Sequence, residues 1–187
     1  MSMNESTEEV TGRNTGMAKD ILEWVQAIII ALAIGFIIKT FVFTQVLVDG
    51  TSMLPTLENG DRLLIYRFMY TPKAGDVVVF RPAHDPIKPY IKRVIAVEGQ
   101  SVDIDAETSS VYVDGVLQVE PYILEPLNQA GDTNYPITVP KDHIFVMGDN
   151  RNSSEDSRRS RVGMVKTSTV MGKAVFRWWP LKGIGTI

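Results

Sequence analysis

The sequence predicts a mainly β protein, with bent antiparallel sheets or a partial barrel, that follows one N-terminal transmembrane helix. Two observations carry this prediction. One long apolar run lies near the N-terminus, whereas after residue 43 the apolar residues occur in short segments typical of strands. No long amphipathic helix is visible after residue 50, so helices are not expected to dominate the domain.

The composition excludes several classes of protein. The chain has 187 residues, 44% of them hydrophobic, and a formal net charge of -3, values that fit one globular domain with an appendage. No basic block occurs, so a nucleic-acid partner is not expected. Because there is no cysteine, disulfides, thiolate metal sites and cysteine nucleophiles are excluded together.

Residues 21–43 form the predicted transmembrane anchor. The stretch Trp24–Phe43 contains one charge, Lys39, and one amide, Gln26, and as a helix it spans about 30 Å, the thickness of the hydrocarbon core. A buried core helix would show a polar stripe, and none is present. A cleaved signal peptide would need small residues just after the apolar run, which continues instead as Thr44–Val48.

The polar residues 1–20 are expected to be a disordered cytoplasmic tail. Arg13 and Lys19 give only a weak positive-inside signal, so the residues alone leave the orientation of the anchor open.

Residues 44–187 read as a β domain. Strands are predicted at 45–49, 62–66, 76–80, 90–97, 101–104, 144–147 and 173–179. Asp114-Gly115, inside the apolar stretch 111–117, is a strong hairpin signal. The stretch 120–140 is rich in Pro, Asn, Gly and Asp and is predicted to be a long loop or small insertion.

Three segments could carry chemistry, although each also has an ordinary structural interpretation. Ser52 lies between Gly50 and Pro55, which suits a nucleophile held exposed on a constrained turn but also suits a plain turn. Lys92 and Arg93 interrupt an apolar strand, so at least one of these cations needs a partner or a lowered pKa, unless the strand lies at a sheet edge.

The third segment is the polar stretch from Met147 to Arg158, which follows a short apolar strand. A solvated turn and a calcium loop are the alternatives, but the spacing of an EF-hand is absent. His84 and His143 lie in a proline-rich loop and before a strand, and no H-E-x-x-H motif occurs, so histidine or zinc catalysis has little support and no metal or other cofactor is expected.

Taken together and in this order, the three segments resemble the bacterial type I signal peptidases, in particular the short Gram-positive type. The motifs are S-M-x-P-T-L at 52–57, K-R-V-I at 92–95 and G-D-N-R-x-x-S-x-D-S-R at 148–158, and the likeness covers nearly the whole chain after residue 20. The resemblance implies the fold of that family and a membrane-bound serine endopeptidase that removes N-terminal signal peptides from exported precursors.

The resemblance also implies roles for the matched residues. Ser52 would be the nucleophile and Lys92, as a neutral amine, the base. The Ser52 amide would supply one oxyanion donor. The supporting residues would be Ser154, which orients the Lys92 amine, the Asp156–Arg158 ion pair, which braces the loop, and Asp149, which pairs with Arg93.

The chain departs from the pattern of some relatives at Gly50, where those relatives have a serine that supplies a second oxyanion donor. The Thr51 hydroxyl is the candidate replacement, while Ala96 stands in place of a glycine.

The nucleophile is expected near the membrane surface, because the nine residues from Phe43 to Ser52 reach about 30 Å at most. The substrate is expected to bind as an added strand, and its small side chains would meet a surface formed by Val46, Val48, Leu57, Tyr90 and Ile91. Six residues are candidates for contact with the lipid or for the core: Phe68, Met69, Tyr70, Phe176, Trp178 and Trp179.

These interpretations make signal-peptide-bearing precursors and the lipid bilayer the expected partners. The chain would cross the cell membrane once, with its N-terminus cytoplasmic and residues 44–187 extracytoplasmic. A related self-cleaving repressor would need a DNA-binding domain where the anchor lies, and a non-catalytic membrane-tethered β scaffold remains the alternative. The oligomeric state is not predicted.

Overall fold

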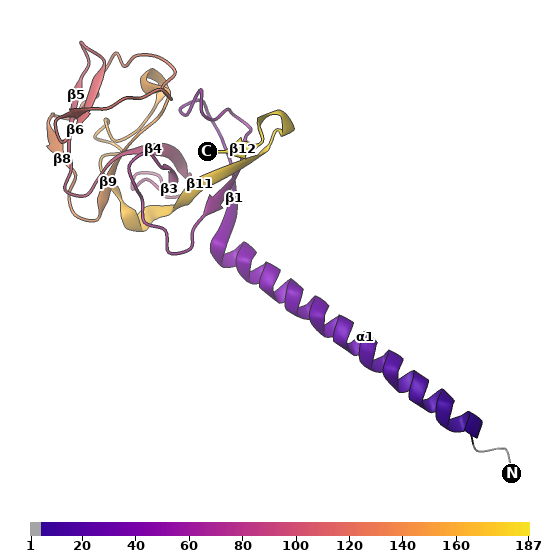
Figure 1. Ribbon diagram of the computed structural model, residues 1–187. Helices are drawn as coiled ribbons and strands as arrows, with labels where there is room; N and C mark the ends of the chain where they lie inside the picture. The colour runs from indigo at the N-terminus through magenta and orange to yellow at the C-terminus, as the bar shows by residue number, and fades with distance from the viewer. Residues whose placement is uncertain (1–4) are drawn as a thin grey trace. The chain divides into compact units, whose positions relative to one another are not determined.

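The computed structural model describes residues 5–187, with side-chain environments from residue 19 onward. The chain divides into two units, residues 1–42 and 43–187. The first contains helix α1 (Glu5–Ile37) and a final π-helical turn, η1 (Ile38–Val42). The second contains all of the strands (Figure 1).

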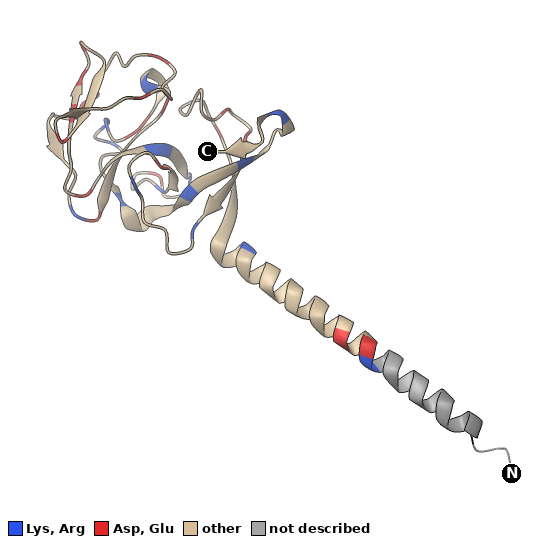
Figure 2. Ribbon diagram, viewed as in Figure 1, with Lys and Arg blue, Asp and Glu red and all other residues tan. Residues whose placement is uncertain are grey.

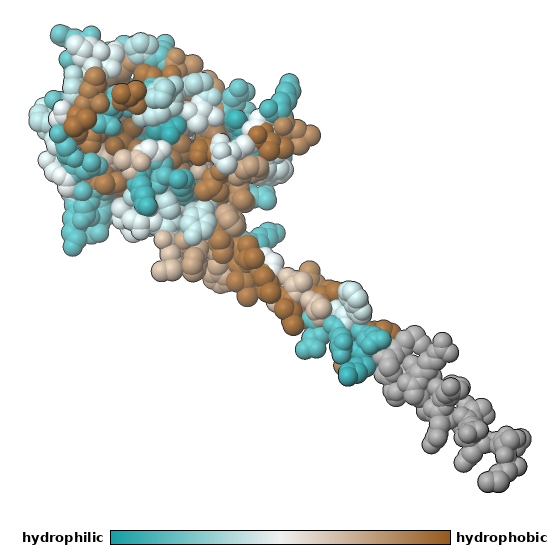
Figure 3. Space-filling view, viewed as in Figure 1, coloured by the Kyte–Doolittle hydropathy of each residue, from teal (hydrophilic) through white to brown (hydrophobic). Residues whose placement is uncertain are grey.

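The segment Lys19–Val42 is long and apolar enough to cross a membrane. The side chains from residue 19 to residue 41 are all exposed, including Leu32 at 69% and Phe36 at 68%. Figure 2 shows this stretch without charge between the acidic residues near its start and Lys39, and Figure 3 shows its hydrophobic surface. A soluble core helix would have its apolar face covered by protein, so the exposed surface suits lipid.

Helix α1 begins at Glu5, inside the segment 1–20 that was predicted to be a disordered cytoplasmic tail, and residues 1–4 lie outside the described chain. Once a helix has formed, each added residue gains one backbone hydrogen bond, so a proline-free polar segment can extend an existing helix.

The larger sheet of the β unit is antiparallel and curls into a half barrel (Figure 1). Its strand order is β1-β2-β11-β3-β4-β9-β10, with β12 paired to β11. The strands are β1 (Phe43–Leu47), β2 (Arg62–Tyr66), β3 (Val77–Phe80), β4 (Tyr90–Val97), β9 (His143–Met147), β10 (Val165–Lys166), β11 (Val170–Trp179) and β12 (Gly185–Thr186). The predicted mainly β fold is confirmed, although β1 begins two residues before the predicted strand and β11 begins three residues before.

A second, four-stranded sheet has the order β7-β6-β5-β8. Its strands are β5 (Ser101–Asp105), β6 (Ser110–Val113), β7 (Val116–Leu117) and β8 (Ile137–Thr138). The turn between β6 and β7 has positive φ at both Asp114 (52°) and Gly115 (76°), as a two-residue hairpin of this kind requires. The stretch predicted as a loop or insertion, residues 120–140, is irregular up to Pro136 and then contributes β8.

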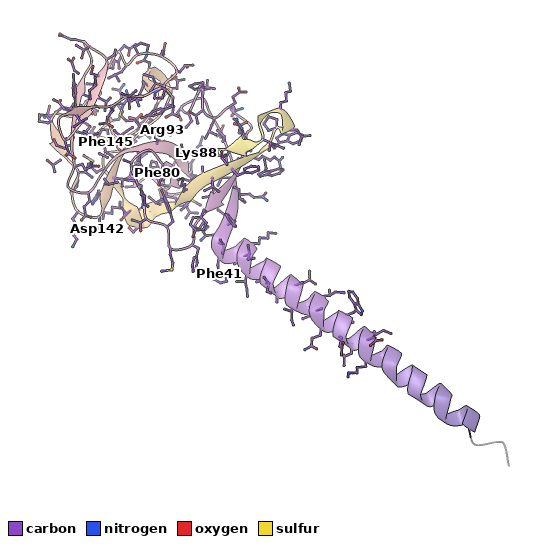
Figure 4. The ribbon with its side chains drawn as sticks, viewed as in Figure 1. Phe41, Phe80, Lys88, Arg93, Asp142 and Phe145 are labelled. Atoms are coloured by element: carbon purple, nitrogen blue, oxygen red, sulfur yellow. The ribbon has the colours of Figure 1, made fainter. Side chains whose placement is uncertain are left out.

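Buried apolar side chains form three clusters inside this unit. Phe80 and Phe145, both fully buried and labelled in Figure 4, belong to different clusters. The cluster around Met53, Leu57 and Ile91 lies directly under the segment that carries Ser52, so the core fixes the position of that segment.

The six residues considered for lipid contact divide by exposure. Phe68 (50%), Met69 (87%) and Trp179 (46%) are exposed, whereas Tyr70, Phe176 and Trp178 are partly buried.

Candidate active site

Ser52 lies on the turn that follows β1, and hydrogen bonds from two other loops hold this turn. Gly50, with φ of +109°, donates its amide to Asn59 Oδ1 at 2.9 Å. The Asn150 amide donates to the Ser52 carbonyl at 3.0 Å, and Asn150 Nδ2 donates to the Thr51 carbonyl at 3.1 Å. The backbone of the serine is therefore held from both sides.

Lys92 lies on β4, opposite Val78 of β3, and only 4% of it is exposed. Its Nζ lies 2.8 Å from Ser52 Oγ and donates to the Ile91 carbonyl at 2.9 Å. The fold thus brings together two residues forty positions apart, at hydrogen-bond distance.

Burial lowers the pKa of Lys92 from 10.5 to about 8, because the ammonium form loses hydration inside the protein. The negative charge of Asp156 acts in the opposite direction, and the positive charge of Arg158 adds to the lowering. With this pKa, about a tenth of the Lys92 side chains are the neutral amine at pH 7 and about half at pH 8. Only this form can accept a proton from a serine hydroxyl.

Asp156 and Arg158 form a buried ion pair beside Lys92. Arg158 Nε donates to Asp156 Oδ1 at 2.8 Å, and Arg158 Nη2 donates to Oδ2 at 2.9 Å. The Gly148 amide also donates to Asp156 Oδ2 at 2.9 Å. Burial alone would raise the pKa of Asp156, but the hydrogen bonds and charge of Arg158 dominate and lower it. The pair links both ends of the loop from Gly148 to Arg158.

Asp149 and Arg93 form a second, bidentate pair. Arg93 Nε and Nη2 donate to the two carboxylate oxygens of the fully buried Asp149 at 2.8 and 2.6 Å. The Thr56 hydroxyl donates to the same carboxylate at 2.5 Å. This pair joins β4, the polar loop and the segment after Ser52.

The Ser154 hydroxyl was expected to hold the Lys92 amine, but it has no hydrogen-bond partner among the residues that the structure describes. It lies close to Gly148, where a Cβ would collide with Ser154 Oγ and with the Ser52 carbonyl. Only glycine therefore fits at position 148. Thr51 is exposed, and among residues 5–187 no hydrogen bond engages the Ser52 amide.

A groove of about 360 Å³ leads to the Ser52–Lys92 pair. One wall is formed by residues 46–53, the other by residues 88–92, and Glu155 closes one side. Of the five residues expected to contact substrate, Val46, Val48, Tyr90 and Ile91 line it. Leu57 was placed wrongly at this surface, since its side chain is fully buried in the core cluster beneath the turn.

The calcium-loop alternative finds no support in the geometry. No group of His, Cys, Asp and Glu suited to a metal ion occurs among the described residues. The carboxylates of Asp149 and Asp156 are instead paired with arginines. His84 Nε2 lies 3.3 Å from the Tyr90 hydroxyl and His143 Nδ1 lies 2.7 Å from the Lys141 carbonyl, so neither contacts Ser52.

Sequence reasoning missed several residues that fix the polar loop. Asn150 lies within this loop and donates to the carbonyls of Ser52 and Thr51. Glu120 is another, because both of its oxygens pair with the buried Arg151, at 2.6 and 2.7 Å. Tyr122 lies against Arg93, whose guanidinium carbon is 4.0 Å from the ring centre. Asn150 and Arg151 stand inside the third motif, whereas no pattern points to Glu120 or Tyr122.

Comparisons with known proteins relate the whole chain to one family. A family model described as signal peptidase, peptidase S26, matches residues 21–179. Signal peptidase I of Bacillus licheniformis is 36% identical, over 95% of this chain and 97% of the relative. A probable signal peptidase I-1 of Synechocystis is 37% identical, over 89% and 87% of the two chains. A solved signal peptidase I from Enterococcus faecalis is 28% identical with a TM-score of 0.48, covering 56% of this chain and 97% of that one.

Proposed function

Because the chain belongs to the signal peptidase family, peptidase S26, we propose that Ser52 and Lys92 are the residues with which it cleaves signal peptides. The protein is a serine endopeptidase that removes signal peptides from precursor proteins. The observation that carries the assignment of the two residues is the 2.8 Å contact between Ser52 Oγ and the buried Lys92 Nζ.

In the proposed reaction, the neutral Lys92 amine takes the hydroxyl proton as Ser52 Oγ attacks the carbonyl carbon of the scissile bond. The ammonium that forms then protonates the leaving amine, and an acyl group remains on Ser52. Lys92, neutral again, takes a proton from a water molecule as the water oxygen attacks the ester carbon. The Lys92 ammonium then returns this proton to Ser52 Oγ, which leaves as the free hydroxyl while the acyl group departs as the carboxylic acid product. The Ser52 amide is the proposed donor to the developing oxyanion.

The supporting residues hold the catalytic side chains in place and do not react themselves. The Asp149–Arg93 pair holds the polar loop against β4, and the Asp156–Arg158 pair braces the loop internally, so Lys92 keeps its place beside Ser52. Asn150 holds the carbonyls of Thr51 and Ser52. We propose that the Ser154 hydroxyl forms a hydrogen bond with the Lys92 amine during the reaction and so orients it.

The walls of the groove suit an extended peptide. β1 is an edge strand of the sheet, and β4 pairs with β9 only from Arg93 onward, so Tyr90–Lys92 also has an open edge. A substrate segment between these edges could form hydrogen bonds on both sides, as an added strand does. Val46, Val48 and Ile91 would then leave room for small side chains.

The test is to replace Ser52 by Ala and Lys92 by Met in separate variants and to follow processing of a secretory precursor. Both variants should lose processing by at least about a thousandfold, because nucleophile and base act as a unit. Ser168→Ala, at an exposed position, is the matched control. If both variants still process the precursor, the residue assignment fails and the scaffold alternative gains support.

We also propose that the N-terminus lies in the cytoplasm and the β unit outside the membrane. The apolar segment Lys19–Val42 supports a single crossing. Because the chain lacks cysteine, single cysteines report topology cleanly. An impermeant maleimide should label Ser168→Cys on intact cells and should label Ser2→Cys only after the cells are opened; the reverse pattern would contradict the orientation.

A further inference from the structure

The groove that leads to Ser52 carries few charges. Within the described chain, the charged side chains that line it are those of Asp49, Lys88, Lys92 and Glu155. Lys92 is buried against the serine, whereas the other three are exposed to solvent. A bound peptide would therefore meet the charges of Asp49, Lys88 and Glu155 rather than that of the catalytic base.

Asp49 and Lys88 join the two walls of the groove. Asp49 follows β1 on the first wall, and Lys88, labelled in Figure 4, precedes β4 on the second. Lys88 Nζ lies 2.9 Å from Asp49 Oδ2, and both side chains are largely exposed, at 57% and 70%. The carboxylate raises the pKa of Lys88, so the lysine is fully charged at neutral pH.

The length of the intervening chain limits the distance of this ion pair from the reacting atoms. Lys88 precedes Lys92 by four residues, which is at most about 13 Å of extended chain. An extended substrate advances by the same rise per residue. The pair therefore lies within about four residues of the scissile bond along a bound peptide.

We propose that Asp49 and Lys88 are specificity-determining residues that together make the groove neutral toward the fourth substrate residue before the cut. This inference rests on the proposed function, because it takes the groove as the place of the substrate. Each charge masks the other while the pair is intact, so the enzyme accepts basic, acidic and uncharged residues there. Removal of one partner exposes the other charge to the substrate.

The two single replacements should act in opposite directions. Lys88→Gln leaves Asp49 facing the peptide without its partner, so cleavage of a peptide with a basic side chain there should become faster and cleavage of one with an acidic side chain slower. Asp49→Asn leaves the Lys88 cation without its partner, so cleavage of a peptide with an acidic side chain there should become faster. The interchange of the two charges, Asp49→Lys with Lys88→Asp, restores a neutral pair.

The experiment uses the full-length enzyme in detergent and three peptides that differ only in Lys, Gln or Glu at the fourth residue before the cut. The readout is kcat/KM for the Lys and Glu peptides relative to the Gln peptide of the same variant. We expect the wild-type enzyme to distinguish Lys from Glu by less than about twofold. Lys88→Gln should prefer Lys by about twofold to fivefold, and Asp49→Asn should prefer Glu by a similar factor.

Two further measurements separate local recognition from general charge effects. Lys141→Gln and Asp103→Asn change the net charge equally at exposed positions outside the groove, so they should keep the wild-type ratios. The preferences of the single variants should shrink in about 1 M salt, because exposed charges are screened.

The proposal is overturned if either single variant keeps the wild-type ratio, or if the control variants shift it as much. It is also overturned if the single variants no longer cleave the Gln peptide while the interchanged variant does. That result would mean that the ion pair holds the two walls of the groove in place and does not select the substrate. These outcomes leave the roles of Ser52 and Lys92 untouched, since they are measured on active enzyme.

Discussion

At the scale of single residues, the chemistry depends on the protonation state of one amine. Burial removes water from around Lys92 and brings its pKa to about 8, whereas an exposed lysine would be almost wholly protonated at neutral pH. The neutral form lies next to Ser52 Oγ, with the Ile91 carbonyl as acceptor for one of its hydrogens. The base is thus oriented before substrate arrives.

The pH dependence of activity should follow this group. Below about pH 8 the amine is increasingly protonated and cannot accept the serine proton, so kcat/KM should rise with pH and level off above about 8. A pH profile between 6 and 10 tests this. The double variant His84→Ala, His143→Ala should keep the rising limb, since neither imidazole contacts Ser52; a lost or shifted limb would implicate a histidine.

The size of the residue at position 91 should set substrate selectivity. Ile91 lines the groove and is 9% exposed, so Ile91→Ala would deepen the surface that meets the substrate. Peptides with a residue larger than alanine at the first or third position before the cut should gain about tenfold in kcat/KM relative to the alanine peptide. Val116→Ala, at an exposed hairpin position, is the control. Unchanged selectivity would mean that Ile91 does not contact the substrate side chains.

At the scale of elements, the irregular segment between β7 and β8 lies along the polar loop that follows β9. The Leu124 amide donates to the Asp149 carbonyl, and Asn128 and Pro126 exchange hydrogen bonds with Asn152. The Glu120–Arg151 pair is almost fully buried. This segment was predicted to be a loop or insertion, and its contacts show that it covers the loop carrying Asp149 and Ser154.

Loss of Glu120 should destabilise the protein. Glu120→Ala would leave the buried Arg151 guanidinium without its carboxylate, at a cost of about 3–5 kcal/mol. We expect the midpoint of thermal unfolding to fall by roughly 10 °C, measured on the full chain in detergent. The exposed neighbour Glu125→Ala should change it little.

A double variant distinguishes the buried charge from the packing around it. Glu120→Leu with Arg151→Leu removes both charges and should recover much of the loss. An unchanged midpoint in Glu120→Ala would mean that water or another group replaces the carboxylate.

At the scale of the whole molecule, the chain consists of two units with different surfaces. The helix presents apolar side chains over the length of a membrane crossing, whereas the β unit has its own buried clusters and contains every residue of the groove. Anchoring and catalysis should therefore be separable.

A variant that begins at Phe43 should fold and cleave a short peptide with a kcat/KM within about tenfold of the full chain, because the groove and its core are complete in residues 43–187. The same variant should lose processing of a membrane-inserted precursor, since the anchor no longer concentrates the enzyme at the membrane. Ser52→Ala in the truncated chain is the control. A truncated chain that fails to cleave the peptide would show that the anchor is needed for the catalytic unit itself.

Features that depend on neighbouring residues could be predicted from the amino-acid sequence. The anchor follows from a continuous apolar run, the hairpin from the tolerance of Asp114 and Gly115 for positive φ, and the strands from short apolar segments. The motifs named Ser52 and Lys92, but only by resemblance.

The contacts between side chains far apart in the sequence could not be predicted and are known from the fold. It joined Ser52 to Lys92 across the sheet, placed Leu57 in the core rather than at the groove, and left Ser154 without a partner among the described residues. The physical reason is that desolvation and hydrogen bonding depend on neighbours in space, and these come from strands that pair far apart in sequence. A local pattern specifies the backbone of a segment, whereas the surroundings that lower the pKa of Lys92 exist only once the sheet has closed around it.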